Sequence, residues 1–248
     1  MTNTLPHRAH VITGGFPLGS PAGHDHDLAR LRLLHLLADR DMPASVGNDF
    51  ADVAKYLPTT RLLITYVAGP YPDETQCAAI SGWLETGGHW LALHGTSGGR
   101  AERVEGFRQR RTVKMAHHAL LGGFFLTHPP LCKFRVDVKP HPLTAGVAAS
   151  FEIEDERYFV ELQDPANTQI LLTADYGPSA VSPTIGTLYP TDTSLQADGK
   201  TRVLGYTRPV GAGAVTYYAL GHSQPDGYRV PWDNDAFVTL LRNAVAAV

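Results

Sequence analysis

Short apolar runs alternate with amphipathic stretches along the first half of the chain. The runs lack polar alternation, which is typical of strands buried on both faces of a parallel sheet. Between residues 25 and 39, Leu28, Leu31, Leu34 and Ala38 have the spacing of one helical face. The pattern therefore predicts strands at 10–13, 43–46, 62–67 and 90–93, and helices at 25–39 and from 72–74 to the glycines at 87–88.

The second half is less regular and favours strands. Candidate strands lie at 134–139, 156–160, 169–174, 203–207 and 214–220, and a closing amphipathic helix is expected within 233–248. Residues 177–200 are rich in Pro, Gly, Ser and Thr and are expected to form a long loop, a lid or an edge hairpin. We predict a single α/β domain over 1–248, with a mostly parallel sheet and late antiparallel additions.

The charge and the cysteines narrow the class of protein. The formal net charge is -3, and one basic cluster at 103–114 is better explained as a solvated helix or loop face than as an anion site. We therefore expect neither a nucleic-acid nor a membrane partner. Cys77 and Cys132 lie in contexts that do not suggest pairing, and no apolar targeting segment is seen. A cytoplasmic location is expected.

Polar residues follow several predicted strands directly. In parallel sheets ligands bind at the carboxyl ends of the strands, so these positions have priority as a site. His94 and His222 each follow an apolar run and are expected to point into one crevice. The same reasoning marks Gly15 after the first strand, and it marks Thr96 and Ser97 as substrate-binding candidates in the turn after residue 93.

The stretch Leu91–Arg100, LALHGTSGGR, reads as a strand running into a tight turn. Such turns present nucleophiles in many α/β enzymes, but histidine is a poor acyl nucleophile and neither cysteine lies there. Glycines at 95, 98 and 99 would let a substrate approach the backbone. We therefore interpret His94 as a metal ligand or proton-transfer group.

Two further segments contain candidate ligands. GHDHD, residues 23–27, is explained by helix capping through Asp25 or Asp27, with His24 a weak metal signal. FEIEDERYF, residues 151–159, is either a solvated edge strand or the source of a functional carboxylate, Asp155 or Glu156.

A third segment, MAHHALLGGFFLTHPP, contains three histidines. It is expected to be a helix that ends at Gly122-Gly123 and carries His117 and His118 on its surface. His128 lies in a loop that returns towards the sheet. Neither a dinucleotide fingerprint nor a phosphate-binding loop is present, so no nucleotide cofactor is expected.

Five segments together resemble the ThuA-like (trehalose utilization) family of the class I glutamine amidotransferase-like fold. They are GGHWLALHGTSGG (87–99), LLGGFFLTHP (120–129), HPLTAGV (141–147), DERY (155–158) and GAGAVTYYALGH (211–222). The resemblance implies a flavodoxin-like three-layer sandwich and a role in trehalose or keto-glycoside metabolism. Cysteine-dependent amidotransferase chemistry is not expected, because the turn lacks the cysteine.

Two functions from different classes follow. The first is a sugar hydrolase or isomerase with catalytic His94, His222, Glu156 and Asp155, in which His94, His222 and Glu156 hold a divalent metal such as zinc. The second is a non-catalytic sugar-binding or regulatory protein whose aromatic residues stack on a sugar, with Tyr66, Trp90, Tyr158 and Trp232 as candidates. In both, a small sugar is the ligand and a homo-oligomer is a possible assembly. The substrate-binding residues would be Gly15, His24, Gly95, Thr96, Ser97, His128 and Tyr158.

Overall fold

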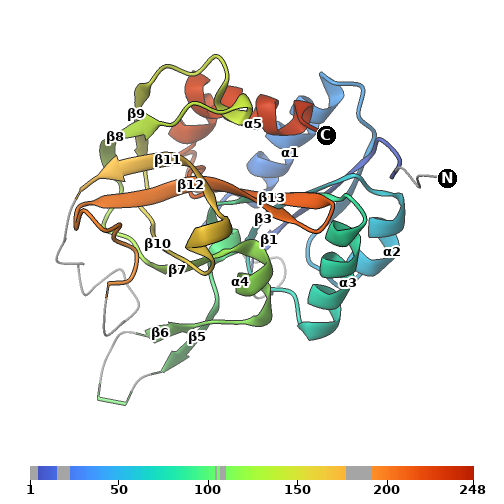
Figure 1. Ribbon diagram of the computed structural model, residues 1–248, viewed down its shortest axis with the longest axis horizontal. Coiled ribbons are helices and arrows are strands. Elements are labelled where there is room, and N and C mark those ends of the chain that lie inside the picture. Colours follow the sequence, from blue (N-terminus) through green and yellow to red (C-terminus); the bar gives the residue numbers. More distant parts are fainter. Residues whose placement is uncertain (1–4, 16–22, 104, 107–109, 177–191) are drawn as a thin grey trace.

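A nine-stranded sheet forms the centre of the molecule (Figure 1). The computed structural model describes residues 5–15, 23–103, 105–106, 110–176 and 192–248. The strand order is β2-β1-β3-β4-β13-β12-β11-β8-β9. Strands from both halves of the sequence therefore meet in one sheet, with β4 beside β13.

The first five strands in this order are parallel to one another. Their cores are the apolar runs of the sequence, and nearly every residue of β1, β3 and β4 is buried. This matches the prediction of a parallel sheet covered on both faces. The strands are β1 (Ala9–Gly15), β2 (Ala44–Gly47), β3 (Leu62–Ala68), β4 (His89–Leu93) and β13 (Gly213–Tyr218).

The remaining strands extend the sheet through antiparallel pairs, as expected for the late additions. Strand β9 lies at the edge and alternates between exposed and buried positions, as one solvated face requires. These strands are β12 (Thr201–Val210), β11 (Gln169–Asp175), β8 (Cys132–Val138) and β9 (Ser150–Asp155).

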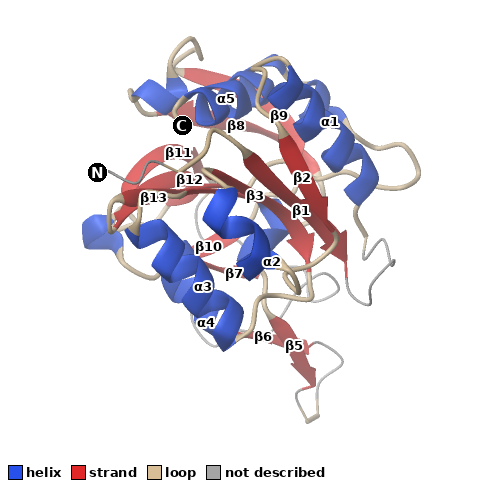
Figure 2. Cartoon of the chain, turned by 90° about the vertical axis from the view of Figure 1, so that its right-hand side faces the viewer, coloured by secondary structure: helices blue, strands red, loops and turns tan. Residues whose placement is uncertain are grey.

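Helices cover both faces of the sheet, and so complete the predicted three layers (Figures 1 and 2). Helices α1 (His26–Ala38) and α5 (Asp235–Ala246) lie together on one face, and α2 (Val53–Tyr56), α3 (Glu74–Glu85) and α4 (Ala116–Leu121) lie on the other. Asp25 caps α1 by accepting a hydrogen bond from the Leu28 amide. Asp73 and Gln76 form a capping box at α3. The 3₁₀ turns are η1 (Leu57–Thr59), η2 (His94–Ser97), η3 (Pro142–Thr144), η4 (Pro165–Asn167) and η5 (Val230–Asp233).

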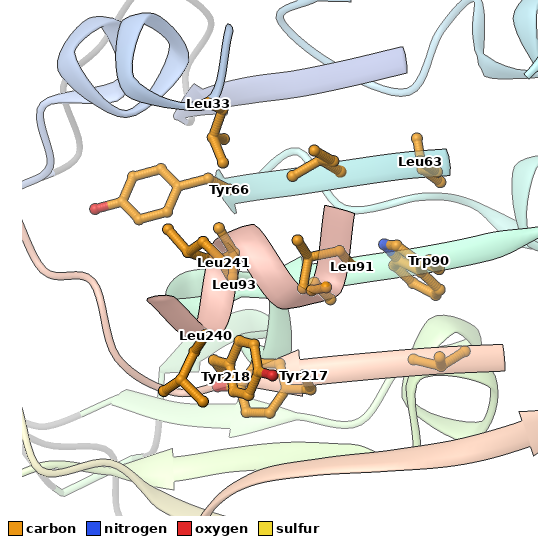
Figure 3. Packing of buried hydrophobic residues seen from close by; sticks show 14 of the residues in the cluster. Leu33, Leu63, Tyr66, Trp90, Leu91, Leu93, Tyr217, Tyr218, Leu240 and Leu241 are labelled. Carbon is orange, nitrogen blue, oxygen red and sulfur yellow. The ribbon is translucent and has the colours of Figure 1, made fainter. Parts of the chain in front are cut away.

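The core between α5 and the parallel strands is formed by large side chains (Figure 3). Leu240 and Leu241 of α5 face the sheet beside Leu93 and Tyr218. Trp90 is buried and donates its indole N–H to the Thr65 hydroxyl over 2.9 Å. This packing fixes the strand ends that hold the site.

Two small two-stranded sheets lie apart from the main sheet, and of their strands only β10 overlaps a predicted one. Strand β7 (Gly123–Thr127) pairs with β10 (Phe159–Leu162), and β5 (Arg100–Arg103) pairs with β6 (Arg110–Val113). The β5–β6 pair projects from the body in both views. The strand predicted at 156–160 begins only at Phe159, because residues 156–158 leave the edge strand and turn towards the sheet's carboxyl end.

One prediction about α4 was wrong. The helix does end at Gly122, whose φ of 87° suits glycine, but His117 and His118 are buried rather than exposed. Their rings are tilted against each other with centroids 3.9 Å apart, and both donate towards the Gly98 carbonyl. They support the turn that carries His94 from beneath.

Two other expectations concern the loop at 177–200 and the cellular location. Most of the loop expected at 177–200 lies outside the described residues, which resume at Asp192. Among the helices of the described ranges, none has the length and apolar character needed to cross a membrane. The cytoplasmic location stays a prediction.

Candidate functional site

The turn η2 after strand β4 places His94 at the carboxyl end of the sheet. His94 has a φ of 45°, in the left-handed region that residues other than glycine rarely adopt. Such a conformation costs about 1–3 kcal/mol and is kept where the surrounding structure requires it. The side chain is fully buried. The tight strand-to-turn geometry expected of LALHGTSGGR is thus present.

Hydrogen bonding sets the orientation of the His94 ring. Nδ1 donates to the Ala219 carbonyl over 2.8 Å, because a carbonyl can only accept. Nε2, on the other side of the ring, lies 3.1 Å from the Tyr158 hydroxyl. A carbonyl behind one ring nitrogen, with the other directed into the site, is the arrangement seen for metal-binding histidines.

Glu156 links the two strand-end histidines. Its Oε2 lies 3.4 Å from Nε2 of His94 and 3.4 Å from Nδ1 of His222. The rings of His94 and His222 have centroids 5.4 Å apart. The structure therefore brings together three residues that lie far apart in the sequence, from the turn after β4, the segment after β9 and the loop after β13.

His24 closes this group at the start of α1. Its ring makes edge-on contacts with His94 at 5.0 Å and with His222 at 5.2 Å between centroids. One ligand-capable atom from each of four side chains lies within 4.8 Å of the others. The four are His24, His94, Glu156 and His222, and together they form the histidine–carboxylate group.

The donor set and its spacing suit a tetrahedral cation. Zinc binds imidazole nitrogens and carboxylate oxygens at about 2.0–2.2 Å, so tetrahedral ligands lie about 3.3–3.6 Å apart. The 3.4 Å separations from Glu156 to His94 and His222 match this value. Both ring nitrogens of His222 are buried and make no hydrogen bond within the described chain. A buried, unbonded nitrogen is costly unless a ligand completes it.

The electrostatics also favour a positive charge between these groups. Burial lowers the pKa of His222 to about 4, so its ring is neutral and its lone pair is available. Burial alone would raise the pKa of Glu156, but the hydrogen bond to His94 and the surrounding histidines lower it to about 2. Burial opposes protonation of His94, yet the carboxylates of Glu156 and Asp155 raise its pKa overall. Either a proton or a metal cation between these groups would offset the negative charge of the carboxylates.

Asp155, expected as a catalytic carboxylate, lies behind the site and outside the cavity wall. It is fully buried, and both oxygens are occupied by backbone N–H donors from Glu156, Gly221 and His222 at 2.7–3.1 Å. Burial raises the pKa of Asp155 to about 6. The residue positions Glu156 and His222 and does not contact the cavity.

A cavity of about 360 Å³ opens over the histidine–carboxylate group. Its wall includes six predicted site residues: His24, Gly95, His128, Glu156, Tyr158 and His222. Nε2 of His128 lies 3.7 Å from Oε1 of Glu156. Gly15 lines a neighbouring cavity instead.

Two predicted substrate-binding side chains point away from this cavity. The Thr96 hydroxyl donates to the Thr65 carbonyl over 3.0 Å, and the Ser97 hydroxyl lies 2.7 Å from that of Tyr217. Both are buried and brace the turn. Trp90 and Trp232, considered as stacking residues, are buried in the core and do not line the cavity.

The sequence reasoning missed three residues of the cavity wall. Tyr71, Phe125 and Gln224 line it. Phe125 belongs to β7, and the phenylalanine pair in LLGGFFLTHP was a usable signal for a buried strand. Tyr71 lies in the loop after Val67, to which the strand-end rule gives priority, but its aromatic side chain was not singled out.

Solved structures of other proteins share this fold. ThuA-like proteins from Bacteroides uniformis and Parabacteroides merdae superpose with TM-scores of 0.63 and 0.64 at 16% and 17% identity. The matches cover 97% of this chain in both cases, and 91% and 89% of those chains. A cold-adapted β-galactosidase from Rahnella matches with a TM-score of 0.59 at 13% identity, over 98% of this chain and 31% of its own. At these identities the likeness shows the fold alone.

The comparison with family models identifies a larger relationship. The model described as trehalose utilisation matches residues 23–246, which include every residue of the histidine–carboxylate group. No curated protein matches the sequence. Because the match spans most of the chain, this protein belongs to the ThuA (trehalose utilisation) family, and its role is related to trehalose utilisation.

Proposed function

We propose that this protein is an enzyme that acts on trehalose-like or keto-glycoside sugars with the help of a divalent metal ion such as zinc. One observation carries the proposal: four ligand-capable atoms of His24, His94, Glu156 and His222 converge within 4.8 Å at the floor of a cavity. In α/β sheets this end of the strands is where substrates bind. The family relationship supports a sugar as the substrate.

His94, His222 and Glu156 would hold the metal, and His24 would supply a further ligand. When bound, such an ion polarises a carbonyl or activates a water molecule. The protein's part is to hold the ligands in place and to keep His222 neutral and Glu156 ionised. Low pKa values for His222 and Glu156, at about 4 and about 2, serve that purpose at neutral pH.

His128 is the candidate proton-transfer group beside the metal ligands. Its Nδ1 donates to the Pro129 carbonyl over 2.9 Å, which leaves Nε2 directed at the cavity as an acceptor. Tyr158 is suited to the opposite task. Burial keeps its pKa well above the usual value, so its hydroxyl stays protonated and can donate to a substrate oxygen. Together they support proton abstraction next to a sugar carbonyl, with isomerisation or hydrolysis as the outcome.

A non-catalytic sugar-binding protein is the second candidate function. It is favoured by the aromatic wall of the cavity, where Tyr71, Phe125 and Tyr158 offer flat apolar faces to the C–H face of a sugar ring. Saturable binding of a sugar without product, with and without added zinc, would favour this alternative over an enzyme.

Metal analysis of the purified protein tests the leading proposal. The native protein dialysed against zinc should retain about one equivalent, and His222→Ala should lose it. His35→Ala, which changes an exposed histidine on α1, is the matched control and should retain the metal. Equal zinc content in the native protein and His222→Ala would overturn the metal site.

Turnover is tested separately with a panel of keto and unmodified disaccharides followed by NMR. The zinc-loaded native protein is expected to convert at least one member of the panel, and His128→Gln should slow that conversion while retaining zinc. Conversion that is equally fast in His128→Gln would remove this residue from the proposed mechanism.

A further inference from the structure

Tyr66, near the carboxyl end of β3, touches the histidine–carboxylate group from behind. Its side chain is buried and lines neither of the two cavities, so it does not stack on a sugar as the sequence suggested. We propose that Tyr66 and the neighbouring Ser223 are positioning residues, which fix the spacing of His24, His94 and His222 and thereby set the affinity for zinc. This inference rests on the proposed function of the site.

The ring of Tyr66 packs against two of the proposed ligands. It stacks on the His94 ring, with centroids 5.9 Å apart and an angle of 15° between the planes. It meets the His24 ring edge-on, also with centroids 5.9 Å apart. Both distances lie within the range of about 4.5–7 Å that is typical of ring contacts. One buried ring therefore restricts the tilt of both imidazoles.

The hydroxyl of Tyr66 acts on the third histidine through the backbone. It donates to the Gly221 carbonyl over 3.0 Å, and the indole N–H of Trp232 donates to the same oxygen over 2.8 Å. The N–H of the same peptide bond, which belongs to His222, donates to Asp155 over 3.1 Å. Both polar atoms of the peptide bond that leads into His222 are thus held. Burial raises the pKa of Tyr66 far above its usual value, so the hydroxyl keeps its proton and remains a donor.

Ser223 connects this loop to the start of α1. The Asp25 amide donates to the Ser223 carbonyl over 3.0 Å, and the Ser223 hydroxyl donates to the Asp25 carbonyl over 3.3 Å. The same hydroxyl lies 3.2 Å from that of Tyr66. His24 and His222 directly precede Asp25 and Ser223 in the sequence, so this double bridge sets the distance between the two imidazoles.

The two hydroxyls can be removed with little change in shape. Tyr66→Phe keeps the ring, and Ser223→Ala keeps the backbone bond to Asp25. Residues that orient metal ligands typically change metal affinity at least tenfold when they are replaced, so each variant should bind zinc about tenfold more weakly in a competition titration with a chelating dye. The visible absorption of the Co²⁺-loaded variants should also differ from that of the native protein, because it reports ligand number and geometry. The double variant should lose less than the product of the two single losses, since the two hydroxyls hold the same loop.

Thr60→Val is the matched control. The Thr60 hydroxyl is equally buried and donates to the Tyr56 carbonyl over 2.8 Å, at the other end of β3. This variant should lower the melting temperature as Ser223→Ala does, but keep the native zinc affinity and the native Co²⁺ spectrum. A general loss of stability, by contrast, would weaken zinc binding in the control as well.

Three results would overturn the positioning role while the native protein binds zinc. These are native zinc affinity with a native Co²⁺ spectrum in both Tyr66→Phe and Ser223→Ala, an equal loss of zinc affinity in Thr60→Val, or losses that multiply fully in the double variant. A native protein that binds no zinc would refute the proposed metal site itself, and the positioning role with it. Failure of the inference alone is therefore distinguished from failure of the proposed function.

Discussion

The carboxylate of Asp155 accepts a hydrogen bond from the backbone N–H of His222 over 3.1 Å. The same carboxylate accepts from the Gly221 amide at 2.7 Å. These bonds tie the end of edge strand β9 to the loop after β13. Because Glu156 follows Asp155 directly, one buried side chain sets the distance between Glu156 and His222.

Asp155→Asn is expected to disturb both stability and metal binding. The asparagine oxygen can replace one carboxylate oxygen, but its NH₂ group would then face an N–H donor and leave it unpaired. Hydrogen bonds to charged groups contribute about 1.5–3 kcal/mol, so unfolding in urea should reveal a loss of about that size. Zinc affinity should fall although no ligand is removed. Glu152→Gln, an exposed change on the same strand, is the control; equal behaviour of the two variants would contradict this role for Asp155.

His94→Ala and His222→Ala are expected to differ in stability although both abolish zinc binding and turnover. His94 loses a 2.8 Å hydrogen bond to the Ala219 carbonyl and its packing against Tyr158. That change should cost about 1–3 kcal/mol. His222 has two unbonded ring nitrogens, so its removal should cost less than about 1 kcal/mol. Chemical unfolding at pH 7.5 measures both; a larger loss for His222→Ala would show that its ring is bonded in the folded protein.

Much of the fold was predictable because the buried strands are short and uniformly apolar. Strands β1, β3 and β4 and helices α1, α3 and α5 lie within a few residues of their predicted bounds. The β5–β6 hairpin was not predictable in the same way. Strands β5 and β6 are largely exposed and carry no apolar pattern. Neither the helical period of about 3.6 residues nor the strand period of two therefore marks them in the sequence.

The site was predictable only as far as strand ends reveal it. His94 and His222 follow buried strands, and the parallel sheet brings those ends together. The direction of Glu156 could not be read from alternation, because β9 ends one residue earlier and the chain turns. The burial of His117 and His118 was also hidden, since it depends on their packing beneath Gly98.

His117 is expected to make the protein sensitive to mild acid. Burial, followed by the neighbouring His118, lowers its pKa to about 3, whereas the unfolded value is 6.5. The unfolded state therefore binds the proton first, and the stability present above pH 6.5 is lost as the pH falls towards 3. Between pH 6.5 and pH 5 the loss from this residue would reach about 2 kcal/mol. Urea unfolding at pH 7.5 and at pH 5.0 measures it.

The variant His117→Phe separates this effect from other titrating groups. Phenylalanine keeps the stacking on Tyr71, whose ring lies 5.1 Å away, but cannot bind a proton. It should be less stable at pH 7.5, because the bond to the Gly98 carbonyl is lost. Its further loss at pH 5.0 should be smaller than that of the native protein. His35→Gln changes an exposed histidine and should keep the native difference; the same difference in His117→Phe would assign the acid sensitivity to other groups.

Gly95→Ala and Gly82→Ala are expected to change stability in opposite directions. A Cβ at Gly95 would lie 2.6 Å from the Val67 carbonyl oxygen, which is backbone and cannot move aside cheaply. The turn that holds His94 would shift, so we expect a loss of more than about 2 kcal/mol together with weaker zinc binding. Gly82 lies within α3, and a Cβ there meets nothing within 4 Å. Alanine should stabilise that helix by about 0.5–1 kcal/mol and leave the site unchanged. Thermal unfolding and zinc titration of both variants give the comparison, and unaltered zinc affinity in Gly95→Ala would show that the position of His94 does not depend on this close contact between η2 and β3.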